Sequence, residues 1–171
     1  MGRRRFRGEY TFKVDAKGRV SIPAAFRRVI EAGDPDYTEG LRPQFVLVYG
    51  PKGQDYLEGY TIEEINALED KINSLPASRL KSRLIKEKLT LSHDSEIDPD
   101  GRLVLPARLR EKIGLDKEAV FEGTLNTFRI WAPDRYEQHM SEDDEGLGFD
   151  IPEGTDLMEA LDMALARQGG E

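Results

Sequence analysis

The 171-residue chain contains no cysteine, and this absence excludes both a disulfide framework and a zinc site built on cysteine ligands. A chain without cysteine is compatible with a reducing cytoplasm. No apolar run approaches the ~18 residues that a membrane-spanning helix requires, and no apolar segment of the kind found in signal peptides follows the basic start, Met1–Arg7. We therefore expect a cytoplasmic protein that has no membrane partner.

Histidine is scarce too, which removes most candidates for enzyme catalysis. The two histidines, His93 and His139, lie far apart in the sequence. The contiguous Ser92-His93-Asp94 is not how a catalytic triad is normally supplied, because neighbouring side chains of a strand point to opposite faces. The segment Gly50–Gly53 lacks the spacing of a phosphate-binding loop. We expect no enzyme, no cofactor, no metal site and no small-molecule substrate.

The net charge of −8 averages two oppositely charged ends. Residues 1–30 hold nine lysines and arginines against two acids, a charge of +7, whereas residues 142–171 hold ten acids against Arg167, a charge of −9. The basic end suggests a polyanionic partner, and the acidic end suggests a solvated or regulatory tail. Two alternatives remain open: both ends serve only solubility, or the tail competes with the polyanion for the basic end.

A thirteen-residue segment occurs twice, 83 positions apart, at residues 15–27 and 98–110. Three of its positions exchange one apolar residue for another, and six are identical. The identical pairs are Asp15/Asp98, Gly18/Gly101, Arg19/Arg102, Pro23/Pro106, Ala24/Ala107 and Arg27/Arg110. Such a repeat predicts two copies of one small unit. Because each unit has only about 60–70 residues, we expect the two halves to share a core or the chain to self-associate.

The turn residues predict a strand–turn–strand arrangement in each copy. Asp98, Pro99 and Gly101 occupy the first, second and fourth positions of a type I turn. In the first copy the corresponding turn runs from Asp15 to Gly18. A glycine in the left-handed region after such a turn closes a hairpin with a bulge. We therefore predict that the strands on either side of each turn pair as a local hairpin.

Periodicity and capping signals place the other elements. The predicted strands cover residues 10–14, 20–22, 44–49, 56–60, 103–105, 119–123 and 127–131. The predicted helices cover residues 24–32, 61–75, 77–89, 107–113, 133–140 and 156–167. The chain is therefore expected to be α+β and mainly β. Its expected parts are a first unit at 5–60, a helical connector at 61–89, a second unit at 90–140 and an acidic C-terminal extension at 141–171.

These residues resemble the MraZ family, which has two domains of the SpoVT/AbrB type. The likeness covers residues 5–140 and rests on Phe6–Tyr10, the two turn blocks Asp15–Pro23 and Asp98–Pro106, and Phe128–Trp131. It implies a swapped-hairpin, AbrB-like double-split β-barrel with two pseudo-symmetric repeats in one chain. This sequence departs from the family pattern in Gly50–Asp55, in Glu58–Tyr60 and in its long loop 33–43, and the acidic tail lies outside the shared region.

The resemblance also implies a function. It implies a sequence-specific transcriptional regulator, nucleoid-associated in the cytoplasm, that binds repeated boxes of double-stranded promoter DNA upstream of the division and cell wall gene cluster. It further implies a homo-oligomeric ring. The alternative is a ring-forming protein-interaction scaffold that does not bind DNA.

The first turn is the candidate DNA contact. Arg19 is assigned to base reading, because an arginine can hydrogen-bond O6 and N7 of guanine together. Phosphate contacts are assigned to the lysines, which act as point charges, and to the arginines that precede the first strand. These phosphate candidates are Lys13, Lys17, Arg3, Arg4, Arg5 and Arg7. In the alternative interpretation, Asp15 caps the turn and pairs with Arg19 without any DNA.

The second turn is a weaker candidate. Asp100 occupies the position of Lys17, so this turn carries acids that repel phosphate. We interpret Asp98 and Arg102 as mainly architectural, with Arg102 a weak DNA contact. The turn-forming residues of the two copies are Asp15, Gly18, Asp98 and Gly101.

Overall fold

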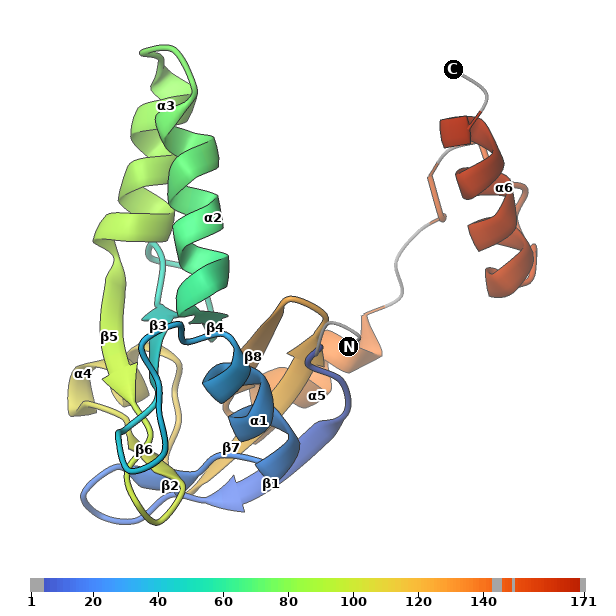
Figure 1. The fold of residues 1–171 in the computed structure, drawn as a ribbon. Coiled ribbons are helices and arrows are strands. Elements are labelled where there is room, and N and C mark those ends of the chain that lie inside the picture. Colours follow the sequence, from blue (N-terminus) through green and yellow to red (C-terminus); the bar gives the residue numbers. More distant parts are fainter. Residues whose placement is uncertain (1–4, 143–145, 149, 170–171) are drawn as a thin grey trace. The chain divides into compact units, whose positions relative to one another are not determined.

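The computed structural model describes residues 5–142, 146–148 and 150–169 (Figure 1). The chain divides into two compact units, Met1–Glu137 and Gln138–Glu171. As expected from the sequence, the fold is α+β and mainly β, with one large antiparallel sheet and several short helices. Within the described ranges, no helix is both long enough and apolar enough to cross a membrane.

The large sheet has six strands in the order β1-β7-β8-β4-β3-β5, and every neighbouring pair is antiparallel. Its strands are β1 (Glu9–Lys13), β3 (Gln44–Val48), β4 (Tyr56–Thr61), β5 (Ser92–Glu96), β7 (Glu118–Thr124) and β8 (Thr127–Trp131). A separate two-stranded ribbon consists of β2 (Arg19–Ser21) and β6 (Arg102–Val104). The order of the strands is symmetrical about its centre, with equivalent strands of the two repeats at matching distances from the β8–β4 pair.

The repeats exchange their strands reciprocally. β1 of the first repeat pairs with β7 of the second, and β5 of the second pairs with β3 of the first. The predicted hairpin loops form, because the Gly18 N–H donates to the Asp15 carbonyl oxygen and the Gly101 N–H donates to the Asp98 carbonyl oxygen, each at 2.9 Å. The prediction that the flanking strands pair with each other along their length is wrong. Across the first turn only one bridge remains, Val14 to Val20, and β2 pairs with β6 instead. Pairing across the repeats lets Val20 and Leu103, both 1% exposed, enter one common core.

The core draws on both repeats. Phe6 and Phe26 from the first repeat meet Phe128 from the second, with ring centroids 5.0 Å apart for Phe6–Phe128 and 5.5 Å apart for Phe26–Phe128. All three side chains are almost completely buried. Each such burial contributes about 1.5–3 kcal/mol, so neither half would keep its hydrophobic stabilisation alone. The expectation that the two repeats share a core is confirmed within the compact unit Met1–Glu137.

Two short helices close the core beside the ribbon, α1 (Ala24–Ala32) and α4 (Ala107–Lys112). Each follows a proline, Pro23 or Pro106, whose fixed φ suits the entry to a helix. On the other face of the sheet, α2 (Ile62–Asn73) packs over β3 and β4. The side chain of Thr61 accepts a hydrogen bond from the Glu64 backbone N–H at 3.1 Å, as the capping signal predicts.

α2, α3 (Arg79–Leu84) and the π-helical segment η1 (Ile85–Thr90) form a helical hairpin that projects from the sheet (Figure 1). α5 (Pro133–Ser141) follows β8 and runs across the boundary between the two units. The compact unit Gln138–Glu171 contains α6 (Leu157–Gly169), close to the helix predicted at residues 156–167. The boundaries proposed from the sequence for the remaining parts stay predictions.

Candidate nucleic-acid interface

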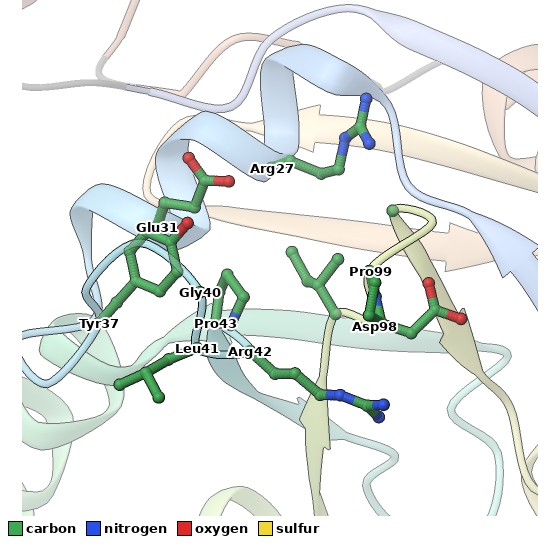
Figure 2. A pocket seen from close by; sticks show the side chains of 11 residues that line it. Arg27, Glu31, Tyr37, Gly40, Leu41, Arg42, Pro43, Asp98 and Pro99 are labelled. Carbon is green, nitrogen blue, oxygen red and sulfur yellow. The ribbon is translucent and has the colours of Figure 1, made fainter.

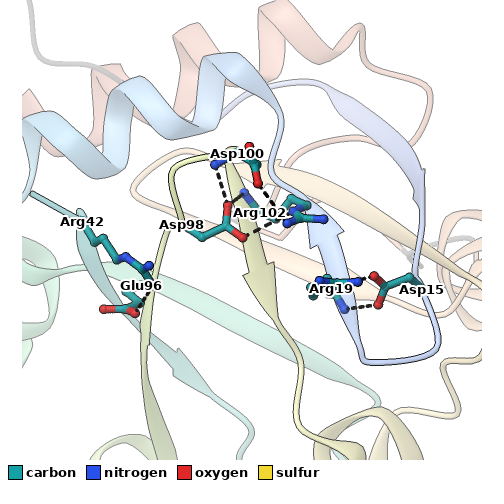
Figure 3. A network of polar contacts seen from close by, with 7 residues as sticks. All are labelled: Asp15, Arg19, Arg42, Glu96, Asp98, Asp100 and Arg102. Atoms are coloured by element: carbon teal, nitrogen blue, oxygen red, sulfur yellow. Dashed lines mark hydrogen bonds and ion pairs between the residues drawn. The ribbon is translucent and has the colours of Figure 1, made fainter. Parts of the chain in front are cut away.

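The first turn is organised by one carboxylate. Asp15 Oδ1 accepts hydrogen bonds from the backbone N–H groups of Lys17 (3.0 Å) and Arg19 (2.8 Å), and its Oδ2 accepts from Arg19 Nε at 2.6 Å (Figure 3). These hydrogen bonds lower the pKa of Asp15. The largest effect comes from the Arg19 backbone N–H, and the Arg19 side chain and the Lys17 backbone N–H lower the pKa further. The turn is therefore fixed in shape with Arg19 held at its end.

The second turn repeats this arrangement with one addition. Asp98 Oδ1 accepts from the backbone N–H groups of Asp100 and Arg102, each at 2.9 Å, and its Oδ2 lies 3.3 Å from Arg102 Nε. Burial raises the pKa of Asp98 as the largest single effect, but the hydrogen bonds and the charge of Arg102 together hold it below its usual value. In addition, Arg102 Nη2 donates to Asp100 Oδ2 at 3.0 Å (Figure 3).

The ribbon brings the two arginines onto one face. Arg19 lies opposite Val104, and Arg102 lies opposite Ser21, whereas Val20 opposite Leu103 faces the core. Arg19 and Arg102 are therefore diagonal neighbours, which are about 7–8 Å apart in an antiparallel pair. The sequence alone placed them in separate loops, and only the exchange of strands puts them side by side.

The two arginines differ in how much of their guanidinium is engaged. Within the described part of the chain, Arg19 uses only Nε, which leaves both terminal nitrogens without a partner there. Arg102 uses Nε and Nη2 on two carboxylates of its own turn. Arg19 thus keeps the two nitrogens needed for a bidentate contact with a base, and Arg102 keeps fewer.

A buttress behind each turn was not anticipated from the sequence. An added Cβ at Gly18 would lie 2.3 Å from the carbonyl oxygen of Leu105 and 3.0 Å from Nε of Arg110. Reciprocally, a Cβ at Gly101 would lie 1.9 Å from Nη1 of Arg27. Each turn is therefore packed against the arginine that ends the thirteen-residue segment of the other repeat, Arg110 behind the first turn and Arg27 behind the second. The identity of that arginine in both copies is the signal that could have revealed it.

The other predicted phosphate contacts fall into two groups. Lys17 in the turn and Lys13 at the end of β1 are exposed, with Lys13 opposite Glu118 in the register of β1 and β7. Arg5 and Arg7 are exposed as well, but they precede β1. At about 3.3 Å per residue, Arg7 lies about 20 Å along the chain from Lys13. Arg3 and Arg4 lie outside the described residues.

These features define a class: an α+β protein in which two sequence repeats share one core and present paired turns on a common two-stranded ribbon. The family model described as "MraZ protein", with the qualifier antitoxin-like, matches residues 5–88 and 90–155. The chain belongs to the MraZ family.

Similar proteins carry the name "Transcriptional regulator MraZ". The protein of Ruegeria sp. (strain TM1040) is 49% identical over 166 residues, covering 96% of this chain and 98% of its own. The protein of Cereibacter sphaeroides (strain ATCC 17029 / ATH 2.4.9) is 48% identical, covering 92% and 95%. The protein of Ligilactobacillus salivarius (strain UCC118) is 38% identical, covering 82% and 90%.

Proposed function

We propose that this protein is a sequence-specific DNA-binding transcriptional regulator and not an enzyme. The observation that carries the proposal is the ribbon face, on which Arg19 and Arg102 are diagonal neighbours. A two-stranded ribbon fits the major groove, where each base pair presents a distinct pattern of donors and acceptors. The names of the relatives support regulation of transcription as the purpose of this binding.

Within this proposal Arg19 reads a base through its two terminal nitrogens, and Lys17 and Lys13 contact phosphates. Arg102 contributes less, because Asp98 and Asp100 form ion pairs with it and repel the phosphates of the DNA. Arg5 and Arg7 reach phosphates farther along the duplex, since they precede β1. Arg3 and Arg4 are proposed for the same role from their sequence position.

We assign the fold to the swapped-hairpin, AbrB-like double-split barrel. The assignment is supported by the reciprocal pairs β1–β7 and β5–β3 and by the β2–β6 ribbon. We also propose assembly into a homo-oligomeric ring that engages several spaced promoter boxes. Once one subunit is bound, its neighbours meet further boxes at a high effective concentration. Equal affinity for a one-box and a four-box probe would argue against the ring.

The target proposed from the family resemblance is the DNA upstream of the division and cell wall gene cluster, in the nucleoid. Footprinting on that DNA tests the target. The mode of binding is tested by comparing Arg19→Ala with Arg79→Ala, which removes an equal charge from the exposed helical hairpin. We expect Arg19→Ala to abolish preference for the cognate box over a scrambled box, and Arg79→Ala to retain it.

Salt dependence separates this function from the scaffold alternative. Each phosphate contact releases counterions, so affinity for the box should fall steeply with salt. Retained box preference in Arg19→Ala would overturn the base-reading role. Absence of DNA binding by the wild-type chain even at low salt would favour a protein-interaction scaffold.

A further inference from the structure

An open cavity of about 310 Å³ lies beside the second turn, outside the exposed face of the ribbon (Figure 2). α1 forms one wall, the loop at residues 33–43 forms a second, and the turn at residues 98–101 forms the third. Its lining includes Arg27, Glu31, Tyr37, Leu41, Pro43 and Pro99. The volume falls at the small end of the range of about 300–1,000 Å³ that ligand sites occupy.

The cavity exists because the two repeats differ in one loop. Eleven residues, 33–43, connect α1 to β3, whereas five residues, 113–117, make the equivalent connection from α4 to β7. The longer loop supplies Tyr37 and Leu41, which have no counterpart in the short connection. It also supplies Pro43, whose counterpart at the end of the short connection is Lys117. This wall therefore belongs to the first repeat alone.

The wall is fixed in place by a buried carboxylate. Asp34, which is 7% exposed, accepts hydrogen bonds from the backbone N–H of Asp36 at 3.0 Å and of Gln44 at 2.9 Å. The backbone N–H of Tyr37 also donates to the Asp34 carbonyl oxygen at 3.1 Å. A wall tied to β3 in this way is formed before any ligand binds, which lowers the ordering cost of binding.

Two of the charged side chains at the cavity are already engaged elsewhere. Arg42 pairs with Glu96 at 2.9 Å, and Asp98 is held by Arg102. Among the described residues, the side chains of Arg27, Glu31 and Tyr37 have no hydrogen bond or ion pair. Figure 2 shows Arg27 and Glu31 one helical turn apart on α1, with Tyr37 on the neighbouring loop. A cation, an anion and a hydroxyl thus border the cavity beside the apolar side chains of Leu41, Pro43 and Pro99.

We propose that this cavity binds a zwitterionic amino acid with an apolar side chain. The ligand's carboxylate pairs with the Arg27 guanidinium, whose fork of donors matches a carboxylate. Its ammonium pairs with the carboxylate of Glu31, and its side chain packs against Leu41, Pro43 and Pro99. A ligand with only one charge leaves either Arg27 or Glu31 without its counterpart. This site goes beyond the proposed DNA binding and does not depend on it.

The test uses the full chain without DNA and two probes, L-leucine and L-phenylalanine. Binding is followed by the amide chemical shifts of residues 27–43 and 98–101 in an NMR titration to about 10 mM, a range that detects Kd values near 1 mM. We expect saturable shifts confined to these segments for at least one probe. No shift with either probe would overturn the proposal.

Two altered ligands and two variants assign the charges. N-acetyl-leucine lacks the ammonium, and leucinamide lacks the carboxylate. We expect each to bind wild type at least tenfold more weakly than leucine. Glu31→Gln should lower the affinity for leucine at least tenfold but leave the affinity for N-acetyl-leucine nearly unchanged. Arg27→Met should lower the affinity for leucine at least tenfold but leave the affinity for leucinamide nearly unchanged. Equal losses for all three ligands in both variants would contradict the assignment of the two charges.

Three controls separate a loss of binding from a loss of folding. Arg27 also packs against Gly101, so Arg27→Met is accepted only if its spectrum outside the cavity matches that of the wild type. Glu31→Gln removes no packing atom and provides the independent variant. Arg28→Met removes a charge from the exposed side of the same helix and should bind leucine with unchanged affinity. A loss in Arg28→Met equal to that in Arg27→Met would overturn the proposed site.

Discussion

Arg110 packs against Gly18, the turn glycine of the other repeat, and its Nε donates a hydrogen bond to the Leu105 carbonyl oxygen at 2.9 Å. The backbone of Gly18 is also tied there, because the Leu105 N–H donates to the Gly18 carbonyl oxygen at 2.8 Å. The first turn is therefore held from behind by the second repeat. The position of Arg19 therefore depends on contacts that the second repeat makes with the neighbouring Gly18.

Gly18→Ala should destabilise the protein for two separable reasons. The φ of +83° alone costs a non-glycine residue about 1–2 kcal/mol, and the added Cβ would also collide with the Leu105 carbonyl oxygen. Gly53→Ala is the matched control, since Gly53 has a φ of +103° and open space around it. In urea unfolding we expect Gly18→Ala to lose at least about 1 kcal/mol more than Gly53→Ala. Equal losses would show that the contact with the second repeat contributes nothing.

The carboxylate of Asp15 predicts a dependence of stability on pH. Hydrogen bonds from Arg19 and Lys17 lower its pKa in the folded protein, so its contribution is fully present above the usual value of 3.8. That contribution is lost as the pH falls through the lowered, folded pKa. The difference in unfolding free energy between wild type and Asp15→Asn should therefore be largest near neutral pH and shrink below about pH 4. A difference that does not change with pH would refute this role.

Three of the positions at which the repeats differ carry opposite charges in the two copies. Lys13, Lys17 and Arg28 of the first repeat correspond to glutamate, aspartate and glutamate in the second. The six identical positions build turns, helix starts and buttresses, so they explain the shared architecture. In the proposed DNA contact, the three charged differences favour phosphate at the first turn over the second.

Asp100→Lys should therefore make the second turn resemble the first. The substitution removes the acid bound to Arg102 Nη2 and adds a cation. We expect tighter DNA binding and a salt dependence steeper by about one phosphate contact. Asp70→Lys makes the same charge change on the exposed surface of α2 and serves as the control. An equal gain in both variants would indicate a general charge effect and no contact at the turn.

An ion pair between a buried glutamate and a half-buried lysine anchors the helical hairpin to the sheet. Glu58 on β4 is 8% exposed, lies 3.2 Å from Lys88 Nζ of η1 and accepts a hydrogen bond from the Tyr60 hydroxyl. Burial and the Glu58 carboxylate raise the pKa of Tyr60, which keeps the phenol protonated as a donor.

Lys88→Met should cost about 1–3 kcal/mol in urea unfolding, because Glu58 is left buried with only one partner. Lys86→Met, on the exposed part of the same segment, should change stability by less than about 0.5 kcal/mol. Restoration of stability in the double variant Lys88→Met/Glu58→Gln is expected as well. Failure of the second substitution to recover any stability would show that lost packing of the Lys88 side chain, and not the unpaired carboxylate, causes the effect.

The sequence by itself determined the local structure of this protein. The turns at Asp15 and Asp98, the helix starts at Pro23 and Pro106 and the cap at Thr61 follow from residues within four positions of one another, whose hydrogen bonds and φ preferences act in any context. The duplication and the charge difference between the turns can also be read directly from the residues.

The tertiary structure alone decided which strands pair. A turn fixes the direction of the chain but does not select the partner of a strand, which depends on where the apolar side chains of both repeats can be buried together. That selection paired β2 with β6, set Arg19 beside Arg102 and placed Arg110 behind Gly18. It also formed the cavity beside the second turn, because a loop of the first repeat reaches the turn of the second only after the two share one core.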